Sequence, residues 1–165
     1  MPVVFQNIFR FILLVLVQVL VLNNIQFIGF INPYIYVLFI LSLPYRTPRW
    51  FQLLLAFATG LIIDAFSNTP GMHTASIVFI AFLRNPVIRI FTSIDEGNNP
   101  TPSFHTFGVS AYIKYVVTLV LFHHTILFLL ESFSFVNIWL TFIKIILSSA
   151  TTLFIIFGIQ SLKKT

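Results

Sequence analysis

Six long runs of apolar residues fill most of this 165-residue sequence. Each run approaches the ~20 residues that an α-helix needs to cross the ~30 Å hydrocarbon core of a bilayer. Charged residues make up only 8% of the chain, whereas a soluble domain carries roughly 25%, so the composition argues strongly against an ordinary soluble fold. The sequence therefore predicts one all-α integral membrane domain with six transmembrane helices, at about residues 3–22, 25–43, 50–66, 72–91, 111–130 and 135–159.

The fourth run is the least regular of the six, because the triplet Arg84-Asn85-Pro86 interrupts it. We expect the guanidinium of Arg84 to snorkel to a membrane interface while its aliphatic stem stays in lipid. The long polar loop that follows, from Thr92 to Gly108, contains the adjacent acids Asp95 and Glu96. The sequence shows no internal repeat and no second domain.

Basic residues are present in alternate connections between the runs and absent from the others. This alternation is the positive-inside pattern, and an even number of spans then places both termini in the cytoplasm. The net charge of +5 is scattered over the ends of apolar runs, so it indicates topology and not a nucleic-acid-binding face. The basic residues that set this pattern are Arg46, Arg49, Arg84, Arg89, Lys114, Lys163 and Lys164.

No catalytic, cofactor-binding or metal-binding signature is present in the sequence. The absence of cysteine excludes disulfides, thiolate metal sites and cysteine nucleophiles. The adjacent His123 and His124 would point ~100° apart on a helix, whereas helical zinc ligands are spaced i and i+4. Phosphate-binding loops and nucleophile elbows are also lacking. We therefore expect a protein that is not an enzyme and binds no cofactor; the enzymatic alternative would use Asp64 and His124.

Several ionisable residues are predicted to lie in the outer half of the membrane. His123 and His124 fall past the middle of the fifth run, and Lys144 falls in the outer half of the sixth, with Glu131 nearby. Ionisable groups at this depth normally face the bundle interior and find partners. Two interpretations stay open for such a cluster: a proton or ligand site, or a structural ion pair that reaches water. His73, at a helix end, is expected to be polar surface.

The segment from Gly60 to His73 is the most informative part of the sequence. Gly60 would let a neighbouring helix approach closely, as small residues do in membrane packing. Pro70 and Gly71 predict a turn between the third and fourth runs. Asp64 lies one turn before the end of the third run, where its carboxylate could accept hydrogen bonds from the free amides that begin the fourth. We therefore expect a structural role for Asp64.

This G-L-x-x-D-x-F-S-x-x-P-G motif, together with the six-span plan and Asn32-Pro33, resembles the bacterial rod shape-determining membrane protein family MreD. The motif positions here are Gly60, Asp64, Pro70 and Gly71. The resemblance implies a non-enzymatic inner-membrane component of the cell-elongation machinery, which helps to organise lateral peptidoglycan synthesis. It also implies a bitopic MreC-like partner, and a fold resembling the substrate-binding subunits of energy-coupling-factor transporters.

A small-molecule transporter subunit of that related fold is the alternative. Such a subunit should present a small-residue Ala-x-x-x-Ala face to its coupling partner, and Phe11 to Leu22 contains neither Ala nor Gly. The elongation interpretation instead requires exposed helix faces that bind other membrane proteins. We expect Ser148 and Gly158, on the sixth run, to lie on such a contacting face.

Overall fold

The structure is a computed structural model that describes residues 3–25, 31–93, 99–132 and 137–162. The regular elements within these ranges are all helices. They are α1 (Val3–Leu20), η1 (Leu22–Asn24), α2 (Val37–Leu41), α3 (Arg49–Ser67), α4 (Met72–Phe91), α5 (Phe104–Phe107), α6 (Val109–Ser132) and α7 (Ile138–Leu162).

In the described part of the chain, five helices of 19 to 25 residues are long and apolar enough to cross a membrane. At 1.5 Å per residue these lengths match a ~30 Å hydrocarbon core. They correspond to α1 with η1, α3, α4, α6 and α7. The prediction of an all-helical, multi-pass membrane protein is therefore confirmed, and residues 135–136 of the expected sixth span lie outside the described residues.

The expected second span, residues 25–43, is not a transmembrane helix over its described part. Residues 26–30 lie outside the described residues, residues 31–36 are not helical, and α2 is only five residues long. Pro33 explains part of this difference, because it lacks an N–H and disfavours helical geometry at the preceding Asn32. A non-helical backbone at membrane depth is tolerated only where protein surrounds it.

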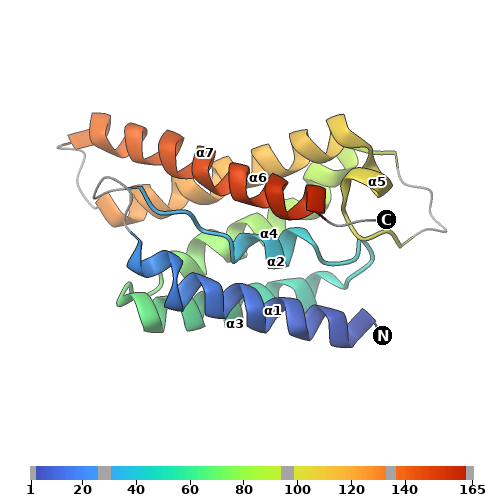
Figure 1. Cartoon of the computed structure of the whole chain (residues 1–165), viewed down its shortest axis with the longest axis horizontal. Coiled ribbons are helices and arrows are strands. Elements are labelled where there is room, and N and C mark those ends of the chain that lie inside the picture. Colours follow the sequence, from blue (N-terminus) through green and yellow to red (C-terminus); the bar gives the residue numbers. More distant parts are fainter. Residues whose placement is uncertain (1–2, 26–30, 94–98, 133–136, 163–165) are drawn as a thin grey trace.

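Residues 31–43, which we call the buried segment, meet this condition. In Figure 1 α2 lies between α7 and α1. No side chain from Tyr34 to Leu41 is more than 7% exposed. The apolar composition of this run therefore reflects burial inside the helix bundle and not contact with lipid.

Side chains of the neighbouring helices bind the amides of the buried segment. The N–H of Tyr34 donates to Oγ1 of Thr152 in α7 at 2.9 Å. The N–H of Ile35 donates to Oε1 of Gln18 in α1 at 2.8 Å. Gln18 also donates from Nε2 to the Pro33 carbonyl at 3.1 Å. These polar side chains replace the hydrogen bonds that a helix would have supplied.

The carbonyls that end α2 are bound in the same way by side chains. Without these side chains, each carbonyl would be an unsatisfied acceptor at a helix C-terminus. Two of the three donor side chains are arginines, whose positive charge suits the negative end of the helix dipole. The pairs are Tyr115 Oη to the Leu41 carbonyl (2.9 Å), Arg10 Nη1 to the Ser42 carbonyl (3.1 Å) and Arg84 Nη2 to the Leu43 carbonyl.

Arg84 therefore does not snorkel to the membrane surface as expected. Its side chain is fully buried, and besides the Leu43 carbonyl its Nη1 donates to Asn85 Oδ1 at 3.3 Å. The triplet at 84–86 also does not interrupt α4, which continues through Pro86 to Phe91. The acceptors that the buried segment offers explain why a guanidinium remains inside the bundle.

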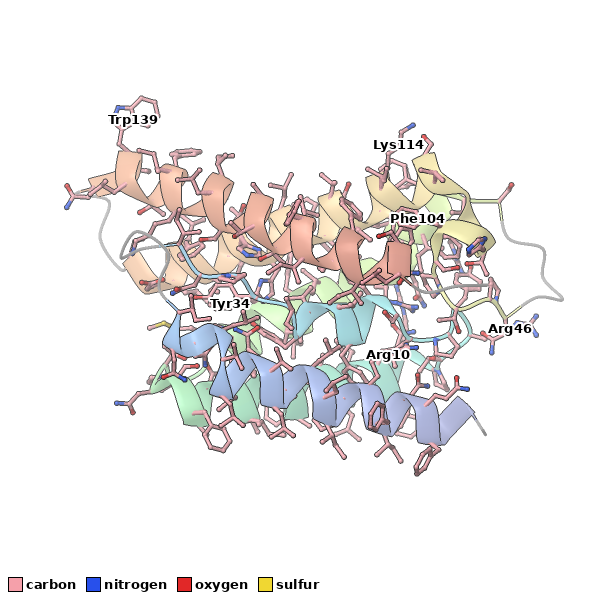
Figure 2. The ribbon with its side chains drawn as sticks, in the orientation of Figure 1. Arg10, Tyr34, Arg46, Phe104, Lys114 and Trp139 are labelled. Carbon is pink, nitrogen blue, oxygen red and sulfur yellow. The ribbon has the colours of Figure 1, made fainter. Side chains whose placement is uncertain are left out.

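The two ends of the bundle carry different side chains. The first turn of α1 and the last turn of α7 lie at the same end in Figure 1, and Figure 2 shows Arg46 and Lys114 at this end and Trp139 at the other. We call the first the arginine-rich end (Arg46, Arg49, Arg84, Arg89 and Lys114) and the second the asparagine-rich end (Asn23, Asn24, Asn32 and Asn68). Asp95, Glu96, Lys163 and Lys164 lie outside the described residues.

Helices α3 and α4 pack very closely where Gly60 faces Thr74. A Cβ built on Gly60 would lie 2.9 Å from the backbone nitrogen of Thr74 and closer still to its Cα, which is nearer than real Cβ atoms come. Gly158 in α7 is the opposite case, since a Cβ there would meet nothing within 4 Å. The expected role of Gly60 in close helix approach is present in the structure.

Gly60→Ala is predicted to destabilise the protein because the added methyl must push α4 away from α3. Overpacking of this kind costs about 1–3 kcal/mol. The midpoint of thermal unfolding in detergent should fall for Gly60→Ala and stay unchanged or rise slightly for the matched control Gly158→Ala. Equal midpoints for the two variants would contradict the close packing at Gly60.

Candidate functional site

The carboxylate of Asp64 joins the end of α3 to the start of α4. Its Oδ1 accepts from the N–H of His73 and its Oδ2 accepts from the N–H of Thr74, each at 3.0 Å. These amides belong to the first turn of α4, where N–H groups have no partner within the helix. The hydrogen bonds predicted for Asp64 are therefore present.

Two hydroxyl groups complete the coordination of this carboxylate. Thr74 Oγ1 donates to Oδ2 at 2.6 Å, and Thr69 Oγ1 donates to Oδ1 at 3.0 Å. The negative charge also lies at the positive end of the α4 dipole. We call Asp64, Thr69, His73 and Thr74 the Asp64 clasp. Because both oxygens accept two hydrogen bonds, the carboxylate is engaged in structure and is poorly placed to act as a base.

The turn inside the clasp requires residues that tolerate a left-handed backbone. Asn68 ends α3 at φ 58°, and Gly71 precedes α4 at φ 82°. Asparagine and glycine adopt these angles most readily. Pro70 and Gly71 thus form the predicted turn, and the motif residues Gly60, Asp64, Pro70 and Gly71 all lie at the junction of α3 and α4.

A chain of hydrogen bonds lies deeper in the bundle and was not predicted. The hydroxyl of Tyr36 lies 2.8 Å from His73 Nδ1 and 2.7 Å from His123 Nε2. The three residues, which we call the histidine–tyrosine chain, come from α4, the buried segment and α6 and are at most 3% exposed. A phenol has one proton, so when Tyr36 donates to one imidazole the other must donate to Tyr36.

His124 binds a different set of atoms. Its Nδ1 lies 2.9 Å from the Val120 carbonyl, and its Nε2 lies 3.1 Å from Thr152 Oγ1. A carbonyl only accepts, so Nδ1 must carry a proton, and the Nε2 of the neutral ring accepts from the Thr152 hydroxyl. Thr152 thereby links His124 to the Tyr34 amide, and this histidine has a defined structural role.

His123 retains one atom without a partner. Its side chain is fully buried, and Nδ1 has no hydrogen-bond partner among the described residues. Around it the rings pack closely, with the Tyr34 centroid 5.1 Å from that of His73 and 6.2 Å from that of His123. An unpaired buried nitrogen costs free energy, so His123 is the member of the chain whose hydrogen bonding is incomplete among the described residues.

The structure separates the residues of the predicted outer-half cluster. His123 and His124 are buried between helices, whereas Lys144 Nζ pairs with Glu131 Oε1 at 3.3 Å with side chains 34% and 44% exposed. Lys144 thus matches the structural ion-pair interpretation. The expectation that His73 is polar surface is wrong, because its side chain is only 3% exposed. The buried segment places the hydroxyl of Tyr36 against its ring.

A polar pocket of about 300 Å³ opens near these residues at the asparagine-rich end. It lies at the lower limit of the volumes typical of small-molecule sites. The described residues contain no group of three His, Cys, Asp or Glu placed to hold a metal ion. The side chains that line this pocket, which we call the outer pocket, include Asn23, Asn32, Tyr34, Ser67, His73 and Glu131.

Sequence reasoning found the Asp64 clasp but missed Tyr34, Tyr36, Gln18 and Thr152. The available signal was a pair of tyrosines and an Asn-Pro step within an apolar run, because buried tyrosine hydroxyls usually require partners. Comparisons with protein-family models, with curated proteins and with solved structures each found no match. Function is therefore inferred below from the motif and the contacts it makes.

Asp64→Ala is predicted to lower stability by about 1–3 kcal/mol or more, because it removes the acceptor for two helix-terminal amides and two hydroxyls. Asp64→Asn should be milder, since it keeps one acceptor oxygen. Thermal unfolding in detergent measures both effects. Unchanged stability of Asp64→Ala, combined with loss of activity in cells, would contradict the structural role.

Tyr36→Phe is predicted to destabilise the protein because it leaves a nitrogen on each of His73 and His123 without a partner. The test is a double-mutant cycle with His123→Leu, in which contacting residues show coupling of about 0.5–3 kcal/mol. The double variant should lose less stability than the sum of the single variants. Additive losses would show that the Tyr36–His123 contact contributes nothing.

Proposed function

We propose that this protein is a non-enzymatic inner-membrane component of the bacterial cell-elongation machinery, of the MreD type, which helps to organise lateral peptidoglycan synthesis. The observation that carries the proposal is the Asp64 clasp. Its carboxylate accepts four hydrogen bonds that join α3 to α4. Asp64 of the motif that resembles the MreD family therefore stabilises the junction of α3 and α4, as expected of a scaffold protein.

We further propose that the chain crosses the membrane six times, with the buried segment as the second crossing. Asn32, near its start, lines the outer pocket at the asparagine-rich end, while Tyr45, just past its end, lies at the arginine-rich end and contacts Arg89. A crossing without a long helix is acceptable where protein surrounds the backbone. Six crossings are also what the resemblance to the fold of energy-coupling-factor substrate-binding subunits implies.

The charge distribution supports an orientation with both termini in the cytoplasm. The start of α1 and the end of α7 share the arginine-rich end (Figure 1). Cytoplasmic ends of membrane proteins carry the excess of Lys and Arg. In the bacterial inner membrane, the asparagine-rich end would then face outward, toward the site of wall synthesis.

Partner proteins are expected to bind exposed helix faces, and α7 offers one of them. Trp139 and Phe154 are 79% and 81% exposed, and Gly158 lies on the surface with open space around it. Ser148 does not belong to this face, contrary to the expectation, because it is buried and accepts from the Asn32 amide at 3.2 Å. We propose that a transmembrane helix of a bitopic, MreC-like partner packs along α7 near Gly158, where the small residue permits close approach.

The outer pocket favours one alternative, a vitamin-type substrate-binding subunit of a transporter. The pocket combines a buried aromatic wall at Tyr34 with polar groups from Asn32, His73 and Glu131. Small-molecule sites have this mixture of apolar walls and few oriented polar groups. The scaffold remains our first proposal because Gly60, Asp64, Pro70 and Gly71 do not line the pocket, and both oxygens of Asp64 are engaged in the clasp.

Depletion of the protein is predicted to make rod-shaped cells round or swollen, because wall synthesis loses its placement but no enzymatic step. Gly158→Trp should insert normally yet fail to restore rod shape and to recover the bitopic partner from native membranes in mild detergent. Gly158→Ala is the matched control and should behave as wild type. Cells that keep their shape but lose uptake of one metabolite, restored by excess of that compound, would replace the scaffold with the transporter.

A further inference from the structure

A polar cavity of about 850 Å³ lies at the arginine-rich end, between the loop that follows the buried segment and the last turns of α4. None of the clasp or histidine–tyrosine residues belongs to it. We call it the basic pocket, and its lining includes Tyr45, Arg46, Thr47, Asn85, Arg89 and Thr92.

The loop that forms one wall of the basic pocket is held in place by its backbone. The N–H of Tyr45 donates to the Pro100 carbonyl at 3.0 Å, and the N–H of Arg46 donates to Asn99 Oδ1 at 2.7 Å. Thr47 is fixed in turn by a hydrogen bond from its Oγ1 to the Pro44 carbonyl at 2.8 Å. The wall is therefore preorganised, which reduces the entropy lost when a ligand binds.

Three guanidinium groups converge on this pocket without an acidic partner among the described residues. Arg46 and Arg89 are exposed and line the cavity, and Arg84 lies behind it, fully buried and bonded to the lining residue Asn85. The ion pair found in the described part of the chain, Lys144 with Glu131, is at the opposite end. The carbonyl and the amide oxygen that bind Arg84 carry no net charge, so these contacts do not neutralise its guanidinium.

The donors in the pocket are also incompletely used. Arg89 donates from Nε to Tyr45 Oη at a long 3.4 Å, and its two terminal nitrogens make no hydrogen bond to the described residues. Guanidinium groups bind phosphate through parallel N–H donors and carry their charge at every physiological pH. A phosphoryl group has three strong acceptor oxygens and a charge between about −1 and −2, so it can accept from two such guanidinium groups at once.

We propose that the basic pocket binds the phosphoryl group of a phosphate ester at the membrane surface. The pocket lies at one end of helices long enough to span a membrane, where lipid headgroups would be within reach. Basic pockets at transmembrane helices bind anionic headgroups. The same chemistry would accept a soluble phosphate ester. This inference is independent of the scaffold proposal, since it concerns the opposite end of the bundle from the outer pocket and the Asp64 clasp.

The competing explanation is that the positive-inside rule alone places these arginines. On that explanation every cation at this end should attract anions equally. The chain offers a matched comparison, because Arg49 lies over the Phe82 ring at 5.4 Å and Lys114 is exposed on α6, both outside the basic pocket. Removing these two charges changes the net charge as much as removing Arg46 and Arg89.

The experiment measures lipid binding by the full chain in detergent, using native mass spectrometry and thermal shift. Phosphatidylglycerol is compared with phosphatidylcholine, and inorganic phosphate and glycerol 3-phosphate serve as soluble competitors. Arg46→Gln/Arg89→Gln should weaken phosphatidylglycerol binding tenfold or more, whereas Arg49→Gln/Lys114→Gln should change it less than twofold. Unfolding midpoints without lipid should match wild type, which excludes misfolding as the cause.

Each outcome bears directly on the pocket. Selective loss of phosphatidylglycerol binding supports a lipid headgroup as ligand, and selective loss of glycerol 3-phosphate binding without a lipid preference supports a soluble phosphate ester. An equal loss in both double variants would overturn the proposal in favour of general charge attraction. It would also be overturned if the wild-type chain bound neither phosphatidylglycerol nor glycerol 3-phosphate.

Discussion

The non-helical backbone of residues 31–36 has to find hydrogen-bond partners inside an apolar bundle, and much of the structure follows from this requirement. In a bilayer each unsatisfied peptide group costs several kcal/mol. Gln18, Ser148 and Thr152 supply partners from α1 and α7, the two helices between which α2 lies. The presence of these three polar residues in apolar spans is thus explained by a non-helical backbone that needs hydrogen-bond partners.

The same requirement explains why cations are found inside the bundle. The buried segment ends in three carbonyls that accept from Arg10, Arg84 and Tyr115. A guanidinium normally avoids membrane depth, but its donors match carbonyl groups at the negative end of a helix. Arg84 therefore connects the interior of the bundle with the basic pocket, where Arg46 and Arg89 add charge that the described residues do not neutralise.

The two ends of the bundle suit different tasks. The asparagine-rich end contains the Asp64 clasp, the outer pocket and the Lys144–Glu131 pair, so its charges are paired or hydrogen-bonded. The arginine-rich end carries Arg46 and Arg89, which have no acidic partner among the described residues. In the proposed scaffold, one end would face the wall-building enzymes and the other would face anionic groups at the inner surface. The two ends would then select different partners, because opposite charges across an interface attract each other.

The sequence by itself determined five long helices and the Asp64 clasp, while the tertiary structure decided the rest. A long apolar run in lipid must satisfy its own backbone, so hydropathy predicts a helix. Asp64 and its amide partners are nine and ten residues apart, so one turn brings them together. Tyr36 and His123 are 87 residues apart and Tyr34 and Thr152 are 118 apart, and their meeting depends on how the helices pack. The second apolar run has the composition of a transmembrane helix. Its residues 31–36 adopt a non-helical backbone because side chains of neighbouring helices supply the hydrogen bonds that a helix would have made.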